Sequence, residues 1–360
     1  MQLADLSKDT KSESIESIQM FRGIAAFMVL LGHSMVNGYF PSDHLLSKIC
    51  LNGWMGVNIF FVISGFIIPY SMYKNNYVLG DFKIFFIKRI VRIEPPYIVS
   101  IAMVLFLNYT NTITKWYKGP AYSIDWGNVM GHLGYLNAFT RKPWLNWAYW
   151  TLAIEFQYYI IIAILFPLLM SSNKKIMMAS FFGLLACFFI HIPGVYRMPF
   201  EPFLLGIPNG DSQDSGSQIL LFLPFFLLGI AYFMYRVEKV TTKEFMIMAG
   251  VATVLCFYRH GLVLSGICIV SLIGIDYIKR VPKPLLWLGT ISYSLYLTHY
   301  VLVSRFLALY LRFTKQSVII GWLVSIVGCL VAAYLFYLLV EKPFIKLGKK
   351  VNYKHKPATA

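Results

Sequence analysis

Arg22 and His33 lie in one apolar segment, IQMFRGIAAFMVLLGHSMV, and their types and spacing point to chemistry inside a membrane. Ionisable side chains are costly in hydrocarbon, so a segment that carries two of them is a candidate functional site. In a helix, eleven residues at about 100° each bring His33 to within about 20° of the face of Arg22, roughly 16 Å further along. A buried imidazole can titrate near neutral pH. This stripe therefore predicts a polar path that contains a candidate acid–base group.

Glu155, in NWAYWTLAIEFQYY, is a second ionisable group within an apolar stretch. It could be a structural counter-charge to Arg22 or to another arginine. It could equally orient His33, as a carboxylate orients the histidine of a catalytic triad. The sequence leaves both roles open.

Further polar groups lie in two other apolar segments. Asn58 and Ser64 belong to GVNIFFVISGF, where neighbouring glycines allow close helix approach. Tyr293 and His299 belong to SYSLYLTHY. Each of these side chains alone could simply pack a helical bundle. Together they predict a polar interior assembled from several helices.

Lys88, Arg89 and Arg92 crowd the stretch KRIVR, just before Pro95 and Pro96. Proline is well tolerated in the first turn of a helix, so we expect a helix to begin here. Free N–H groups at a helix start favour anions, which predicts a site for a phosphate-bearing ligand. The alternative is membrane anchoring by positive charge, which requires no particular spacing.

The composition predicts the elements that position these groups. The chain is 58% hydrophobic and 13% charged, which excludes an ordinary soluble domain. We therefore expect an all-α, polytopic transmembrane bundle of about ten helices. No recurring strand-like alternation supports a membrane barrel. The expected spans are 18–38, 53–72, 95–110, 147–170, 174–192, 218–235, 243–258, 261–278, 284–310 and 316–340.

The distribution of basic residues predicts orientation. Most of the 32 Lys and Arg fall on one side if both termini are cytoplasmic, in agreement with the positive-inside rule. This bias accounts for most of the net charge of +16, so we expect no nucleic-acid partner. The expected organisation is a cytoplasmic tail at 1–17, a membrane domain at 18–345 and a basic cytoplasmic tail at 346–360. The five cysteines form no CxxC motif, so no metal site is expected.

Two long connections, 111–146 and 193–217, fall on the outer face in this topology. The first is rich in Trp and Tyr. Such residues anchor proteins at the membrane interface, but their flat faces also suit sugar rings. The sequence favours neither role over the other.

Several motifs in order resemble the integral-membrane acyltransferase family 3, the bacterial O-acyltransferases of surface glycans. Arg22 and His33 match its Arg-x10-His motif, and Arg89 and Arg92 fill its paired arginine positions. WTLAIE matches its Trp-Ser-Leu-x-x-Glu motif, with Trp150 at the aromatic position. GVNIFFVISGF, SYSLYLTH and a terminal EKP complete the series, so the resemblance covers roughly residues 18–345.

The resemblance implies transfer of an acyl group, usually acetyl, from cytoplasmic acetyl-CoA to a hydroxyl of an extracytoplasmic glycan. The expected location is the bacterial cytoplasmic (inner) membrane. His33 would act as general base and Glu155 would assist, while an acetyl-histidine intermediate is the alternative chemistry. The cofactor-binding candidates are Arg22, Lys88, Arg89 and Arg92, and the substrate-binding candidates are Asn58, Ser64, Trp150, Tyr293 and His299.

The acceptor stays open among O-antigen, capsule, exopolysaccharide and peptidoglycan. The rival function is a transporter or flippase for a lipid-linked saccharide. Such a carrier would share the helical bundle, the buried charges and the aromatic outer loops. It would not need an arginine cluster beside an intramembrane imidazole.

Overall fold

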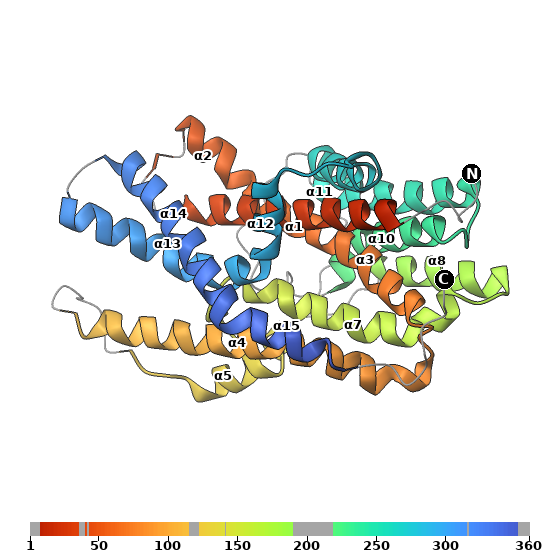
Figure 1. Cartoon of the computed structure of the whole chain (residues 1–360), viewed down its shortest axis with the longest axis horizontal. Coiled ribbons are helices and arrows are strands. Elements are labelled where there is room, and N and C mark those ends of the chain that lie inside the picture. Colours follow the sequence, from red (N-terminus) through yellow and green to blue (C-terminus); the bar gives the residue numbers. More distant parts are fainter. Residues whose placement is uncertain are drawn as a thin grey trace.

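The computed structural model is a helical bundle whose long helices run along a common direction (Figure 1). It describes residues 8–35, 40–41, 43–114, 122–140, 142–189, 219–314 and 317–351. Within these ranges the chain forms helices and no β-strand. Seven stretches are long and apolar enough to cross a membrane. The predicted all-α polytopic bundle is therefore confirmed, whereas the side on which each terminus lies stays a prediction.

The helices that build the bundle are α1 (Lys8–Ser34), α3 (Gly56–Lys74), α4 (Phe82–Thr112), α7 (Tyr149–Leu169), α8 (Lys174–Ala186), α10 (Leu223–Arg236), α11 (Thr242–Tyr277), α13 (Ser292–Thr314) and α14 (Val318–Phe336). The shorter helices are α2 (Leu45–Cys50), α5 (Trp126–Leu133), α6 (Asn137–Thr140), α12 (Lys283–Thr290) and α15 (Lys342–Gly348).

Helix α11 contains two of the predicted spans, 243–258 and 261–278, as two limbs that meet at Gly261. This glycine has φ +80°, a conformation that other residues rarely adopt. The second limb runs back alongside the first. Residues near both ends of α11 contact the end of α10, whereas the middle of α11 contacts the region where α10 starts. The contacts are Tyr235 with Phe245, Arg236 with Asp276, and His260 with Leu221.

The predicted start of the third span at residue 95 is wrong. Helix α4 begins at Phe82 and continues through Pro95 and Pro96. Prolines remove two helical hydrogen bonds, but a membrane helix packed against its neighbours tolerates this loss. Arg89 and Arg92 consequently lie inside α4, one turn apart on the same side. The anion-binding argument from a helix N-terminus no longer applies to them, although their charges remain.

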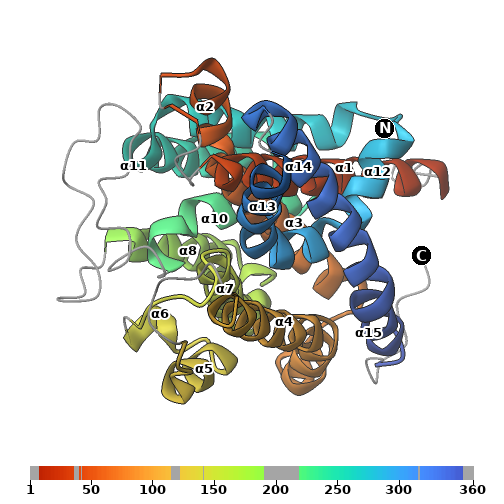
Figure 2. The same ribbon diagram turned by 90° about the vertical axis from the view of Figure 1, so that its left-hand side faces the viewer.

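Glycines bring α3 against its neighbours, as the sequence predicts. A Cβ atom at Gly65 would overlap the carbonyl oxygen of Phe226 in α10, and one at Gly56 would overlap that of Ala25 in α1. Such close approach is typical of membrane helices, where small residues allow tight packing. These close contacts hold α1, α3 and α10 together, and the three helices lie beside α4, α7 and α13 (Figure 2).

The outward faces of several helices are apolar. Phe106 of α4, Leu262 of α11 and Val327 of α14 are all more than half exposed. Large exposed apolar surface is unusual for a water-soluble protein, but it is what lipid tails cover. The polar groups picked out by the sequence are instead collected inside the bundle.

Candidate active site

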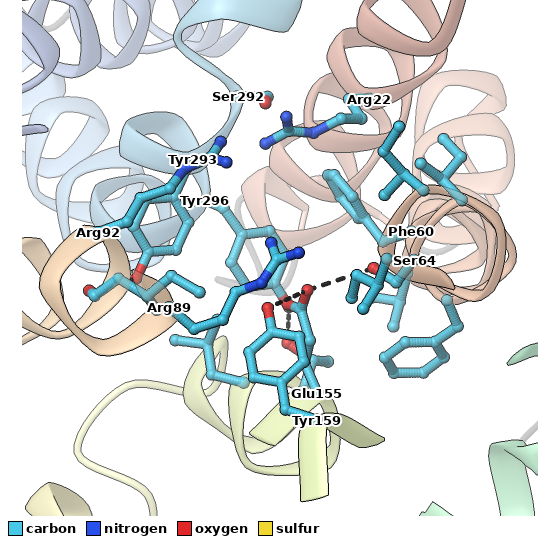
Figure 3. Close-up of a pocket in the computed structure, with 18 of the residues that line it drawn as sticks. Arg22, Phe60, Ser64, Arg89, Arg92, Glu155, Tyr159, Ser292, Tyr293 and Tyr296 are labelled. Carbon is cyan, nitrogen blue, oxygen red and sulfur yellow. Dashed lines mark hydrogen bonds between the residues drawn. The ribbon is translucent and has the colours of Figure 1, made fainter. Parts of the chain in front are cut away.

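A cavity of about 170 Å³ lies between α1, α3, α4, α7 and α13, and it is cationic. The guanidinium groups of Arg22, Arg89 and Arg92 gather around it, together with the carboxylate of Glu155 (Figure 3). The sequence-predicted residues Ser64 and Tyr293 line the same cavity. Six of the predicted site residues are therefore brought together from five helices.

Glu155 is held by hydroxyl groups rather than by a histidine. Its Oε1 accepts hydrogen bonds from the hydroxyl of Ser64 at 3.2 Å and from that of Tyr159 at 2.6 Å (Figure 3). The described residues show no hydrogen bond between Glu155 and His33. Glu155 therefore lies where it can balance the arginines, one of the two roles that the sequence leaves open.

The cavity carries more positive than negative charge. It has three arginines and one carboxylate in its lining. A second carboxylate, Glu341, is buried nearby and accepts hydrogen bonds from the backbone N–H of Ser294 at 3.2 Å and from its hydroxyl at 2.5 Å. The ring of Tyr159 lies 5.6 Å from the Arg89 guanidinium, close enough for a cation–π contact. Such a lining favours an anionic ligand, and phosphate groups suit arginine forks.

His33 and His299 form a buried pair outside this cavity. Nδ1 of His33 lies 2.9 Å from Nε2 of His299. Nδ1 of His299 faces the carbonyl oxygens of Leu295 and Tyr296 at 3.0 and 2.9 Å. A carbonyl oxygen only accepts, so Nδ1 of His299 must carry a proton.

This constraint determines the tautomers of both rings when they are neutral. Nε2 of His299 is then an acceptor, so Nδ1 of His33 must donate its proton to it. The lone pair of His33 is left on Nε2, the nitrogen needed for a general base. His299 is fully buried. It is therefore placed to orient His33 rather than to touch a substrate.

Tyr296 lies next to both the cationic cavity and the histidine pair. It lines the cavity, and its ring centroid lies 5.7 Å from that of His299 and 5.7 Å from that of Phe60. Its hydroxyl lies 2.6 Å from the hydroxyl of Thr151. One aromatic side chain therefore borders both sites.

On its other side, His33 lines a second cavity of about 110 Å³. Arg305 and Asn108 contribute polar groups to it, and sequence reasoning did not select them. Arg305 falls inside the predicted span 284–310. The signal that identified Arg22, a cation within an apolar segment, could therefore have found Arg305 as well.

Besides the histidine pair, three predicted residues do not line the cationic cavity. Lys88 is partly buried on α4, near α15. Asn58 is buried in α3, and its Oδ1 has no hydrogen-bond partner. The ring of Trp150 packs 5.5 Å from that of Phe222. Over the residues that the structure describes, no cluster of potential metal ligands occurs.

The two long connections belong only in part to the described residues. Residues 193–217 lie outside the described residues. In the other connection, the ring of Tyr135 is buried and stacks on those of Tyr97 and Phe156, with centroids 5.2 and 4.8 Å apart. Trp126 of α5 is 61% exposed. The aromatic residues of this connection thus divide between internal packing and an open surface.

The fold and site define a polytopic helical membrane protein with a cationic cavity beside a buried histidine pair. Residues 15–338 match the family model described as "Acyltransferase domain", and the chain belongs to this acyltransferase family. The resemblance seen in the sequence motifs is therefore confirmed.

Similar curated proteins are bacterial. The peptidoglycan O-acetyltransferase OatA of Listeria monocytogenes is 26% identical over 351 residues, which cover 86% of this chain and 54% of that protein. The "Putative peptidoglycan O-acetyltransferase YrhL" of Bacillus subtilis is 26% identical over 368 residues, or 91% of this chain and 54% of that protein. The chain thus spans about half the length of these relatives. No solved structure matches it.

Proposed function

We propose that this chain is a membrane O-acetyltransferase, which moves an acetyl group from cytoplasmic acetyl-CoA to a hydroxyl of an extracytoplasmic glycan. One observation carries the proposal. A cavity lined by three arginines lies on one side of Tyr296, and a histidine with a basic Nε2 lies on the other side, facing a second cavity. The names of the relatives support acetyl as the acyl group.

The cationic cavity fits the donor. Coenzyme A carries a diphosphate and a 3′-phosphate, and Arg22, Arg89 and Arg92 offer charge-assisted donors for such groups. Lys88, on the same helix, would add charge at the approach. The cavity of about 170 Å³ takes only part of this molecule. The Tyr296 ring must therefore move for a thioester to reach His33.

The second cavity fits the acceptor. We infer that Nε2 of His33 removes the proton of the acceptor hydroxyl as its oxygen attacks the thioester carbonyl. The new C–O bond forms, the C–S bond breaks, and the coenzyme A thiolate recovers a proton from His33. In the alternative chemistry, the same Nε2 lone pair first takes the acetyl group and then passes it to the hydroxyl.

Among the possible acceptors, peptidoglycan is favoured because two relatives carry it in their names. The proposed location is the cytoplasmic membrane of a bacterium, which is consistent with the apolar spans. Donor binding on the cytoplasmic side and acceptor binding on the outer side follow from where these two molecules occur.

The test uses inside-out vesicles that contain the chain and its native glycan, supplied with acetyl-labelled acetyl-CoA. Label on the glycan, lost in His33→Gln at matched membrane insertion, supports the proposal. His44→Asn is the control, because it replaces a histidine at the start of α2 with another good N-cap residue. Near-normal transfer by His33→Gln contradicts the role of His33. Unmodified glycan that crosses the bilayer, without acetylation, supports the carrier instead.

A further inference from the structure

The second cavity, which the proposed function assigns to the acceptor, contains polar groups that have no role so far. It is enclosed by α1, α4, α13 and the segment that leads into α7, and His33 forms part of its lining. Its other polar groups come from Asn108, Tyr300, Ser304 and Arg305. Its volume of about 110 Å³ equals that of a few water molecules, enough for one edge of a sugar ring.

Arg305 is fixed in position by two hydrogen bonds. One guanidinium N–H donates to the carbonyl oxygen of Val301 at 2.8 Å, and another donates to Oδ1 of Asn108 at 2.7 Å. Arginine has five N–H donors, so three are left for other partners. The planar group is thus held ready to bind a ligand without further ordering.

Within the described part of the chain, no carboxylate balances the charge of Arg305. No Asp or Glu lines the second cavity, and no carboxylate of the described residues forms an ion pair with Arg305. The arginines of the first cavity, by contrast, share their space with Glu155. A partly buried cation within a membrane bundle is costly, and a bound anion lowers that cost. The lone cation therefore points to an anionic ligand.

The segment before α7 also contributes to the lining of the cavity and is held by hydrogen bonds. Leu145 lines the cavity, and the N–H of Leu145 donates to Nε2 of His132 at 3.1 Å. The adjacent Asn146 donates from Nδ2 to the carbonyl oxygen of Leu297 at 3.1 Å. Both bonds pin the segment before α7 to the bundle. The cavity is consequently preformed rather than a gap beside a loose loop.

We propose that this cavity is the acceptor subsite and that Arg305 binds a carboxylate of the acceptor glycan. The inference rests on the proposed function and adds the chemical class of the sugar, one that carries a carboxylate, such as a uronic acid or a lactyl-substituted amino sugar. Arg305 and His33 line the same small space. A carboxylate held by Arg305 therefore places a hydroxyl of the same sugar at Nε2 of His33.

The first experiment measures binding without acetyl-CoA. Purified protein in detergent is titrated with a carboxylate-bearing oligosaccharide and with the same oligosaccharide after its carboxyl is reduced to an alcohol. We expect the acidic form to bind about ten- to a hundred-fold more tightly, the range for a hydrogen bond to a charged group. Arg305→Gln should abolish this preference and leave the affinity for the reduced form unchanged. Equal affinities in the unmodified protein would overturn the inference.

Two further variants test whether the effect of Arg305→Gln comes from a disturbed fold. Arg305→Lys keeps the charge and should keep part of the preference. Asn108→Asp supplies a carboxylate at the position that already accepts from Arg305, so it should weaken binding of the acidic form alone. The control, Arg312→Gln, removes a charge from an exposed position of the same helix and should change nothing. A loss of both affinities in Arg305→Gln and in Asn108→Asp would indicate a structural role and overturn the inference.

Measuring acetyl transfer distinguishes a failure of this inference from a failure of the proposed function. If the unmodified chain acetylates both oligosaccharides with the same KM, only the carboxylate inference fails. If it acetylates neither but binds the acidic form in an Arg305-dependent manner, the acetyltransferase proposal fails while the carboxylate site stands.

Discussion

The hydroxyl of Tyr296 lies 2.6 Å from that of Thr151, and this contact joins α13 to α7 across the wall between the two cavities. Both groups are buried. The bond therefore holds the ring of Tyr296 between the arginines and the histidine pair. It gives the proposed enzyme a closed state in which thioester and base are kept apart.

Removing the ring of Tyr296 should uncouple acetyl-CoA hydrolysis from acetyl transfer. In Tyr296→Ala we expect acetyl-CoA hydrolysis without a glycan acceptor to rise several-fold, because water can reach the thioester from the His33 side. Tyr296→Phe keeps the ring and loses only the hydroxyl, so it should leak far less. Release of free coenzyme A measures the hydrolysis. Equal, low release in both variants would show that the ring does not control access.

Removing the partner of His33 should lower turnover more than binding. His299→Ala leaves Nδ1 of His33 without its acceptor, and the tautomer with a basic Nε2 is no longer enforced. We expect kcat to fall about a hundred-fold, within the range for general-base catalysis, with little change in KM. His299→Gln offers an amide oxygen to the same Nδ1–H and should recover part of the rate. A change confined to KM would instead indicate that His299 binds substrate.

The three arginines should act on the donor. Arg22→Gln, Arg89→Gln and Arg92→Gln are each expected to raise the KM for acetyl-CoA about ten- to a hundred-fold, since each removes a charge-assisted contact. Lys88→Gln is the matched control from outside the cavity and should have a smaller effect. Repeating the measurement with dephospho-acetyl-CoA identifies which arginine meets the 3′-phosphate. An unchanged KM in all three variants would exclude this cavity as the donor site.

Glu155→Gln distinguishes the two roles that the sequence left open. The amide oxygen can still accept from Ser64 and Tyr159, so the variant removes charge with little change in shape. If Glu155 balances the arginines, the KM for acetyl-CoA should fall a few-fold because the cavity becomes more positive. The pH profile of kcat should stay the same. A shift in that profile would support an orienting effect on His33.

Acid should loosen the segment before α7 only below the ordinary pKa of a histidine, 6.5. Burial lowers the pKa of His132 from its ordinary value of 6.5. Its neutral ring accepts the N–H of Leu145, so the stabilisation is fully present above the unfolded pKa and is lost as the pH falls through the lowered folded pKa. Backbone hydrogen exchange at residues 142–148, corrected for the intrinsic pH dependence of exchange, measures the loosening of this segment. His132→Gln does not titrate and should remove the transition, whereas a midpoint at 6.5 or above would contradict the prediction.

Much of the architecture could be predicted from the sequence, because hydrocarbon imposes a simple rule on composition. Long apolar segments must be helical, so the spans around Ser64 and Glu155 were correctly placed. The predicted span 284–310 is instead divided at Ile291 into α12 and α13. Gly261, the first residue of the predicted span 261–278, adopts a positive φ and divides α11 close to the predicted boundary. The span predicted to begin at residue 95, which is part of α4, was placed wrongly. Its two prolines resemble a helix start, whereas packing against neighbouring helices carries α4 through them.

The sequence by itself determined which groups are costly to bury, and hence that Arg22, His33, Arg89, Arg92 and Glu155 matter. Their partners were decided by tertiary structure alone. Arg22 and His33 share one helix, yet they line different cavities, because different helices surround α1 at the two positions. The pairing of His33 with His299, 266 positions apart, depends on how two helices pack. Spacing along a chain describes one helix face, and only packing between helices determines what that face meets.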